Sequence, residues 1–191
     1  MLAQLGAATP AMSDGFADAA SGWETKIESD VNTAYVNGEF RIWMNGHQNG
    51  VWVANGPSFA GAAVSVDLRS APSSVAHPAG LFVRMQDEGN YQGFVIGDDG
   101  SYLVFHLQNG HFAIDGAANN RLPEGIFRQG GANTVAAVAK GDTISYFVNG
   151  SKIVDAAALW PAGRAGLFAG NGGDGVAETL YDNWSVLELA H

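Results

Sequence analysis

The sequence predicts an all-β fold, built as a sandwich or barrel of short antiparallel strands. Apolar residues alternate with other residues at a period of two along most of the chain, and helical periodicity is nearly absent. The alternating stretches are separated by turn residues, and the chain contains 26 glycines, which supply the positive φ that tight turns need. About a dozen short strands joined by such turns are typical of a sandwich or a barrel.

The first half of the chain contains the clearest alternation. Strands are expected over residues 38–44, 50–56, 61–70, 80–86, 90–97 and 101–108. In the strand over 61–70, one face carries Ala62, Val64, Val66 and Leu68. In the strand over 101–108, one face carries Leu103, Phe105 and Leu107, and we expect this apolar face to pack inward while the opposite face meets solvent. The turns "DDG" (98–100) and "QNG" (108–110) suit tight hairpins.

The second half repeats the pattern. Residues 132–155 are expected to form three strands joined by two turns, and residues 163–170 and 177–189 to form the last strands. Single helical turns are expected only at 15–21 and 155–160. No domain boundary is visible, so we expect one domain over 14–191, preceded by a tail or linker over 1–13.

Charge and composition exclude several classes of function. The net charge of −10 would repel a phosphate backbone over most of the surface, which argues against nucleic-acid binding. The chain has no cysteine, so disulfides and thiolate chemistry are excluded. No apolar run approaches the 18 residues of a membrane span, and the first residues do not form a complete signal peptide.

Five segments, taken together and in order, resemble the concanavalin A-like lectin/glucanase superfamily, and in particular the laminin G-like jelly-roll domains of bacterial exported proteins. They are "DGFADAASGWE" (14–24), "LFVRMQDEGNYQGFVI" (81–96), "VAKGDTISYFVNGSKIV" (138–154), "GRAGLFAG" (163–170) and "YDNWSVLEL" (181–189). The resemblance covers nearly the whole chain from residue 14 onward. It implies a two-sheet antiparallel jelly-roll β-sandwich with one concave and one convex sheet, and a secreted or cell-surface location.

The same resemblance implies a structural Ca²⁺ ion where the first strand meets the last. Asp14, Asp18 and Asp182 are the matching acidic residues, and Ca²⁺ takes six to eight oxygen ligands. The alternative is that Asp14 starts a turn and that Asp182 caps or solvates a strand end.

A retaining glucanase of this fold would need two carboxylates about 5 Å apart on one strand face. The chain has no E-x-D-x-x-E pattern, and its nearest acidic cluster, residues 24–30, lies before the central strands. Relatives that act as lyases use Arg, Gln, His and Tyr, but their sequence motifs are absent here. We therefore predict no catalytic residue, and a glycan-cleaving enzyme acting on the concave face is the alternative.

Carbohydrate binding by such folds uses aromatic faces that stack on sugar rings, with amide and guanidinium groups for the hydroxyls. The candidate ligand-binding residues are Trp43, Trp52, Arg84, Gln86, Tyr102 and His106, while Trp23, Trp160 and Trp184 are expected in the core. The preferred hypothesis is a non-catalytic, lectin-like module of an exported protein that binds a glycan or another surface ligand. A third hypothesis is a structural subunit that self-assembles through its apolar N-terminal tail.

Overall fold

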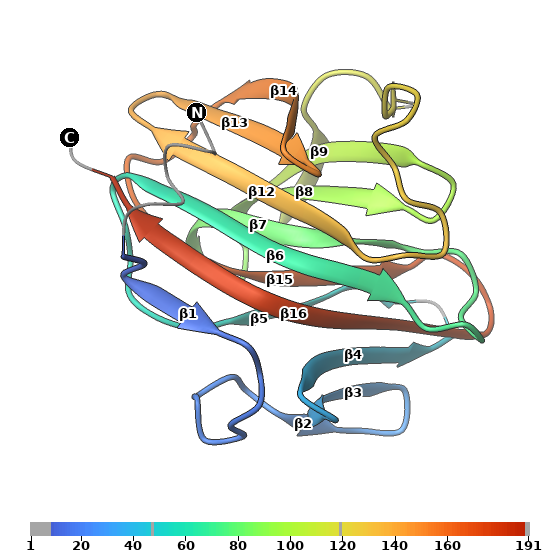
Figure 1. Cartoon of the computed structure of the whole chain (residues 1–191). Helices are drawn as coiled ribbons and strands as arrows, with labels where there is room; N and C mark the ends of the chain where they lie inside the picture. The colour runs from blue at the N-terminus through green and yellow to red at the C-terminus, as the bar shows by residue number, and fades with distance from the viewer. Residues whose placement is uncertain (1–8, 47, 119, 190–191) are drawn as a thin grey trace.

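The computed structural model, which describes residues 9–46, 48–118 and 120–189, is a sandwich of two antiparallel sheets and contains no helix in those ranges (Figure 1). This confirms the predicted jelly-roll β-sandwich. No described segment forms a helix of the length and hydropathy needed to cross a membrane.

The larger sheet, sheet A, has the strand order β14-β13-β12-β6-β16-β4-β3-β2, and β1 pairs with β16. Its strands are β1 (Met12–Asp14), β2 (Lys26–Ile27), β3 (Val31–Val36), β4 (Glu39–Asn45), β6 (Ala62–Ser70), β12 (Asn133–Lys140), β13 (Thr143–Val148), β14 (Ser151–Ala157) and β16 (Val176–Glu188). The smaller sheet, sheet B, has the order β10-β9-β8-β7-β15-β5, and β11 pairs with β9. Its strands are β5 (Gln48–Ala54), β7 (Pro78–Asp87), β8 (Asn90–Gly97), β9 (Ser101–Gln108), β10 (His111–Ile114), β11 (Asn120–Arg121) and β15 (Arg164–Asn171).

The main core lies between the two sheets. The predicted face of β6 is confirmed, because all four of its apolar residues belong to this core. Trp23 and Trp184 are also buried in it, with ring centroids 5.1 Å apart at an interplanar angle of 87°. Each large side chain buried in this way contributes about 1.5–3 kcal/mol. Trp160, expected in the core, is only half-buried.

The prediction for β9 chose the wrong face. Val104 belongs to the core between the sheets, whereas Leu103, Phe105 and Leu107 lie on the outer face of sheet B. The alternation is present, but both faces of this sheet are apolar. A period of two therefore cannot indicate which of the two faces meets sheet A.

A β-bulge in β7 changes the faces predicted for its second half. Leu81 and Val83 point into the main core, but the register with β8 shifts after Val83, and Arg84 adopts a positive φ of 58°. Relative to β15, where Phe82 pairs with Gly166 and Met85 with Arg164, β7 has one extra residue, which turns Met85 to the outer face beside Phe82. The strict alternation expected over 80–86 is therefore wrong from Arg84 onward.

Neither predicted helical turn forms. Residues 15–21 are irregular, with turn and bend residues from Phe16 onward, and Asp155–Ala157 complete strand β14, because pairing with β13 satisfies their backbone groups. At the N-terminus, β1 includes Met12 and Ser13 of the expected tail. Residues 1–8 of that tail lie outside the described residues, so strand donation by the tail stays a prediction.

Candidate functional site

The outer face of sheet B carries a second apolar cluster, here called the outer cluster. Its members are Phe82, Met85, Tyr91, Val95, Phe105 and Phe168, with Trp52, Ala54, Leu103 and Leu107 packed against them. Glycines on neighbouring strands make room for the rings. A Cβ atom at Gly93 would lie 2.4 Å from Phe105, and one at Gly50 would lie 2.6 Å from Phe168. The sequence thus covers this sheet with aromatic rings instead of polar side chains.

Tyr91 lies among the rings of the outer cluster, with centroid distances of 5.4 Å to Phe82 and 6.2 Å to Phe105. Burial raises the pKa of Tyr91 to about 12, so its hydroxyl stays protonated at neutral pH. Phe112 on β10 stacks on Phe105 at 5.4 Å and is 56% exposed, which extends the aromatic surface to the edge of the sheet.

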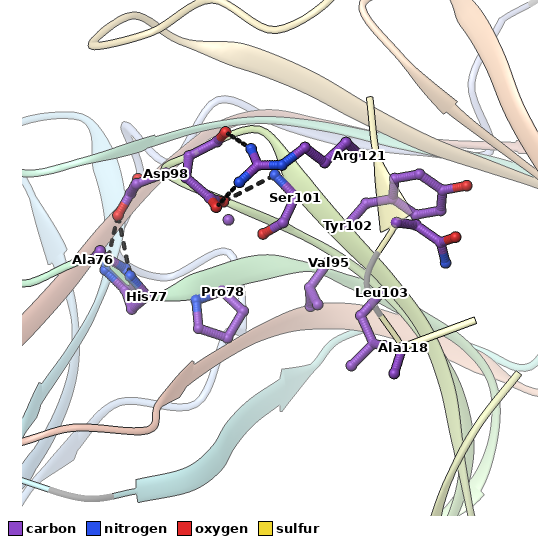
Figure 2. Close-up of a pocket in the computed structure, with 13 residues that line it drawn as sticks. Ala76, His77, Pro78, Val95, Asp98, Ser101, Tyr102, Leu103, Ala118 and Arg121 are labelled. Carbon is purple, nitrogen blue, oxygen red and sulfur yellow. Dashed lines mark hydrogen bonds and ion pairs between the residues drawn. The ribbon is translucent and has the colours of Figure 1, made fainter. Parts of the chain in front are cut away.

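A hollow of about 450 Å³ adjoins the outer cluster at the start of β9 (Figure 2). We call it the end hollow. Two of its lining residues, Val95 and Leu103, also belong to the outer cluster. The remaining lining residues come from the loop before β7, the β8–β9 turn, the start of β9 and the segment around β11: Ala76, His77, Pro78, Gly97, Asp98, Asp99, Ser101, Tyr102, Ala118, Asn120 and Arg121.

Asp99 and Arg121, which both line the end hollow, form an ion pair. Nη2 of Arg121 lies 2.9 Å from Oδ2 of Asp99, and Nη1 donates to the Asp99 carbonyl at 2.7 Å. The turn that carries Asp99 is closed by Gly100 at a φ of +79°, and Ser101 N donates to Asp99 Oδ1 at 2.9 Å. β11 brings Arg121 into place by pairing with Ser101.

Asp98 fixes the opposite side of the hollow. Its Oδ2 accepts from the backbone N of His77 at 3.1 Å, and its Oδ1 accepts from the Ser70 hydroxyl at 2.5 Å. The His77 ring is buried, with Nδ1 donating to the Val75 carbonyl at 2.9 Å and Nε2 lying 2.6 Å from Oγ1 of Thr179. These bonds hold the loop before β7 against sheet A, so the residues on this side of the end hollow are fixed in position.

The charged groups of the end hollow are better suited to hydrogen bonding with a ligand than to proton transfer in catalysis. Hydrogen bonds from Ser101, and then the Arg121 guanidinium, lower the pKa of the Asp99 carboxyl. A general acid needs the opposite shift, toward neutral pH. The hollow therefore offers fixed acceptors on Asp98 and Asp99, donors on Arg121 and Asn120, and an apolar floor.

The structure does not gather the six predicted ligand-binding residues in one place. Tyr102 alone lines the end hollow. Trp52 packs at the other end of the outer cluster, on edge strand β5, and Trp43 lies in sheet A. His106 lies beside Asp115, with Nδ1 2.8 Å from Oδ1.

Arg84 and Gln86 bind backbone carbonyls of the protein itself. The Arg84 side chain is buried, and its guanidinium donates to the carbonyls of Phe59, Pro161 and Gly141. Gln86 donates to the carbonyl of Arg84 at 3.0 Å. Burial lowers the pKa of Arg84 by desolvation. Its interior position follows from the bulge in β7, which the sequence pattern did not reveal.

The three predicted calcium ligands are used in local hydrogen bonds. Asp14 accepts from Phe16 N at 2.7 Å and from the indole of Trp23 at 2.9 Å. Asp18 accepts from Ala20 N, and Asp182 from Asn183 N. Within the described ranges no group of three His, Asp or Glu side chains is arranged to hold a metal ion. Calcium binding stays a proposal that rests only on the resemblance in sequence.

Sequence reasoning missed most of the end hollow. The "DDG" stretch at 98–100 was interpreted only as a turn, and Asn120 and Arg121 fell in an expected irregular connection. Asp99 and Arg121 are 22 residues apart, and no spacing rule links a turn to a two-residue strand at that separation. The only local signal is the pair of adjacent acids in a tight turn, which is common on solvated surfaces.

Comparison with solved structures gives strong likenesses. A carbohydrate binding module, CBM66 from Bacillus subtilis, superposes with a TM-score of 0.64 at 14% identity, over 87% of this chain and 96% of that one. The beta-glucanase of Bacillus licheniformis gives 0.65 at 13% identity, over 93% and 98%. The GH43 protein BlXynB from Bacillus licheniformis gives 0.67 at 17% identity, over 93% of this chain and 39% of that one.

No protein-family model matches the chain, and no curated protein matches it in sequence. At these identities the structural likenesses establish the fold. The chain has the two-sheet jelly-roll sandwich fold that these structures share.

Proposed function

We propose that this chain is a non-catalytic carbohydrate-binding module that holds a neutral glycan in the end hollow. The observation that carries the proposal is the composition of that hollow. An apolar floor of Val95 and Leu103 is surrounded by fixed carboxylate, guanidinium and amide groups. Sugars present the same combination of apolar ring faces and hydroxyl groups, and binding sites for small ligands combine these features. The likeness to a carbohydrate binding module supports this proposal.

The negative charge of the protein limits the class of glycan that it can bind. The net charge of −10 and the acids of the hollow repel uronates, sulfated sugars and other anions. A neutral glycan avoids this repulsion. An extracellular location and the laminin G-like subgroup, both implied by the resemblance, are part of the proposal.

The main alternative, a glycan-cleaving enzyme, draws on the likeness to the beta-glucanase. Retaining hydrolysis needs a carboxylate pair, one of the two with a raised pKa. The buried members of the outer cluster are apolar or aromatic, and the pKa of Asp99 is lowered. These features favour binding without catalysis.

Arg121→Ala tests the proposal. We expect the substitution to weaken binding about tenfold, because it removes a donor and frees the Asp99 carboxylate from its partner. Affinity gel electrophoresis in gels that contain mixed-linkage β-glucan, xylan or galactan, preceded by a glycan array, measures the effect. Lys152→Ala is the matched control, since Lys152 forms a similarly exposed ion pair with Asp155 on β14. Equal retardation of Arg121→Ala and Lys152→Ala would refute the end hollow as the site.

The pH dependence of binding follows from Asp99. A carboxyl group whose folded pKa is lowered stays ionised through neutral pH and loses its charge only as the pH falls through that lowered value. We expect constant affinity from about pH 5 to pH 8 and a decline only at pH values below the ordinary pKa of Asp, about 3.9. Titration calorimetry with the best neutral glycan of the array gives the profile. A maximum near pH 5 with loss of binding at neutral pH would show that a protonated acid is required.

A further inference from the structure

The outer face of sheet A carries a hollow of its own, here called the Trp43 hollow. It measures about 310 Å³ and is lined by Glu28, Ser29, Asn32, Arg41 and Trp43. On β4, the residues at 40, 42 and 44 are fully buried in the core, so Arg41 and Trp43 share the outward face. Trp43 is half-buried and has Asn32 and Glu178 as its neighbours on the adjoining strands.

The Arg41 guanidinium is held in place but retains unused hydrogen-bonding capacity. Nη2 donates to Oδ1 of Asn32 at 2.7 Å, and Nη1 lies 3.9 Å from Glu178. The Nε atom is buried without a partner among the described residues. A guanidinium has five N–H donors, so the short bond to Asn32 leaves donors for a ligand. The Arg41 side chain is 27% exposed and can be reached from solvent.

Two other charged groups on this face, Arg69 and Asp67, are matched within the protein. Arg69 donates to both carboxylate oxygens of Glu39, at 3.0 and 2.6 Å. Asp67 accepts from Thr134 at 2.5 Å and from Asn183 at 2.9 Å. The Trp43 hollow therefore differs from its surroundings, because an indole and a partly satisfied guanidinium line the same depression.

We propose that the Trp43 hollow is a second carbohydrate site, which binds one neutral sugar ring through the Trp43 indole and the Arg41 and Asn32 side chains. An indole offers a flat apolar surface for the sugar ring, while guanidinium and amide groups serve its hydroxyls. Because the two hollows lie on different sheets of the sandwich, one copy of the chain would bind two glycan segments. This bivalence rests on the proposed function of the end hollow, but the Trp43 site does not.

Four proteins test the proposal: the wild type, Trp43→Ala, Arg121→Ala and the double variant. Their retardation is measured in native gels that contain mixed-linkage β-glucan, xylan or galactan. We expect each single variant to bind about tenfold more weakly than the wild type and the double variant to migrate as in a gel without polysaccharide. We also expect the wild type, but none of the variants, to cross-link the soluble polysaccharide, measured as turbidity at equal protein concentration.

The possible results separate the two sites. If Trp43→Ala matches the wild type in retardation and turbidity, the second site is refuted and the end hollow stands. If Arg121→Ala matches the wild type while Trp43→Ala loses retardation, the proposed function of the end hollow fails and the Trp43 site stands. If the wild type is retarded by none of the three polysaccharides, both fail.

Two further variants guard against a folding defect. Trp43→Phe keeps an aromatic face, so we expect it to retain more retardation than Trp43→Ala at an unchanged unfolding temperature. Trp160→Ala replaces a half-buried tryptophan that lines neither hollow and should leave retardation unchanged. Equal losses in Trp160→Ala and Trp43→Ala would mean that the effect is not local to the Trp43 hollow and would overturn the assignment.

Discussion

Arg84→Ala is expected to lower the free energy of unfolding by about 3 kcal/mol. The substitution removes the charged guanidinium donor from the carbonyls of Phe59, Pro161 and Gly141, and a hydrogen bond from a charged group contributes about 1.5–3 kcal/mol. It also opens a cavity, since Arg84 is only 2% exposed. Relief of the desolvation that lowers the Arg84 pKa offsets part of this loss.

Thermal and urea unfolding measure the effect. For a chain of this size, 3 kcal/mol corresponds to a fall in Tm of about 6–12 °C. Arg84→Lys keeps the charge and up to three donors, so we expect a smaller loss than for alanine. An unfolding free energy of Arg84→Ala equal to that of the wild type would mean that the three loop carbonyls do not depend on this side chain.

Gly166→Ala is expected to destabilise the protein by about 2–3 kcal/mol through overpacking. A Cβ atom at Gly166 would lie 2.2 Å from the carbonyl oxygen of Val53 and 2.5 Å from the ring of Phe82. The first contact is with backbone, so strand β5 would have to move away from β15. Such a movement would disturb the packing of Trp52 in the outer cluster, and tryptophan fluorescence together with Tm reports it.

Gly172→Ala is the matched control for this substitution. A Cβ atom at Gly172 meets nothing within 4 Å, and its backbone is not at a positive φ that would strain alanine. We expect its stability to stay within about 0.5 kcal/mol of the wild type. Equal stability of the two alanine variants would contradict the close approach of β5 to β15.

Arg84 and Gly166 both support sheet B beneath the outer cluster. The bulge at Arg84 turns Met85 outward, and Gly166 lets Phe82 lie across the neighbouring strand. The aromatic surface next to the end hollow therefore depends on one strained residue and on glycines. We expect a loss of stability at either position to weaken glycan binding only through unfolding, because neither residue lines the hollow.

Most of the strands were predictable because successive side chains of a strand point to opposite faces, so burial of one face places apolar residues at every second position. The expected strands over 61–70, 80–86 and 101–108 correspond to β6, β7 and β9. The choice of inner face failed at β9, since this strand is apolar on both sides. At β14, pairing with β13 replaced the helical turn that local composition favoured.

The candidate site was much less predictable. Of the predicted ligand-binding residues only Tyr102 lines the end hollow, and Asp99 and Arg121 reach that hollow through a tight turn and a two-residue strand. Arg84 has the residue type of a sugar ligand, and the bulge directs it to loop carbonyls instead. Residue type indicates what a side chain can bind, whereas its position in the fold decides which partner it meets.

The sequence by itself determined the all-β class, the positions of most of the long strands, the turns between them and the net negative charge, because each depends on local alternation, on turn residues or on composition. The tertiary structure alone decided which apolar face became the core, where Arg84 points and which distant polar groups surround one hollow. These depend on strand register and on contacts between residues far apart in the chain, and neither leaves a periodic signal in the sequence.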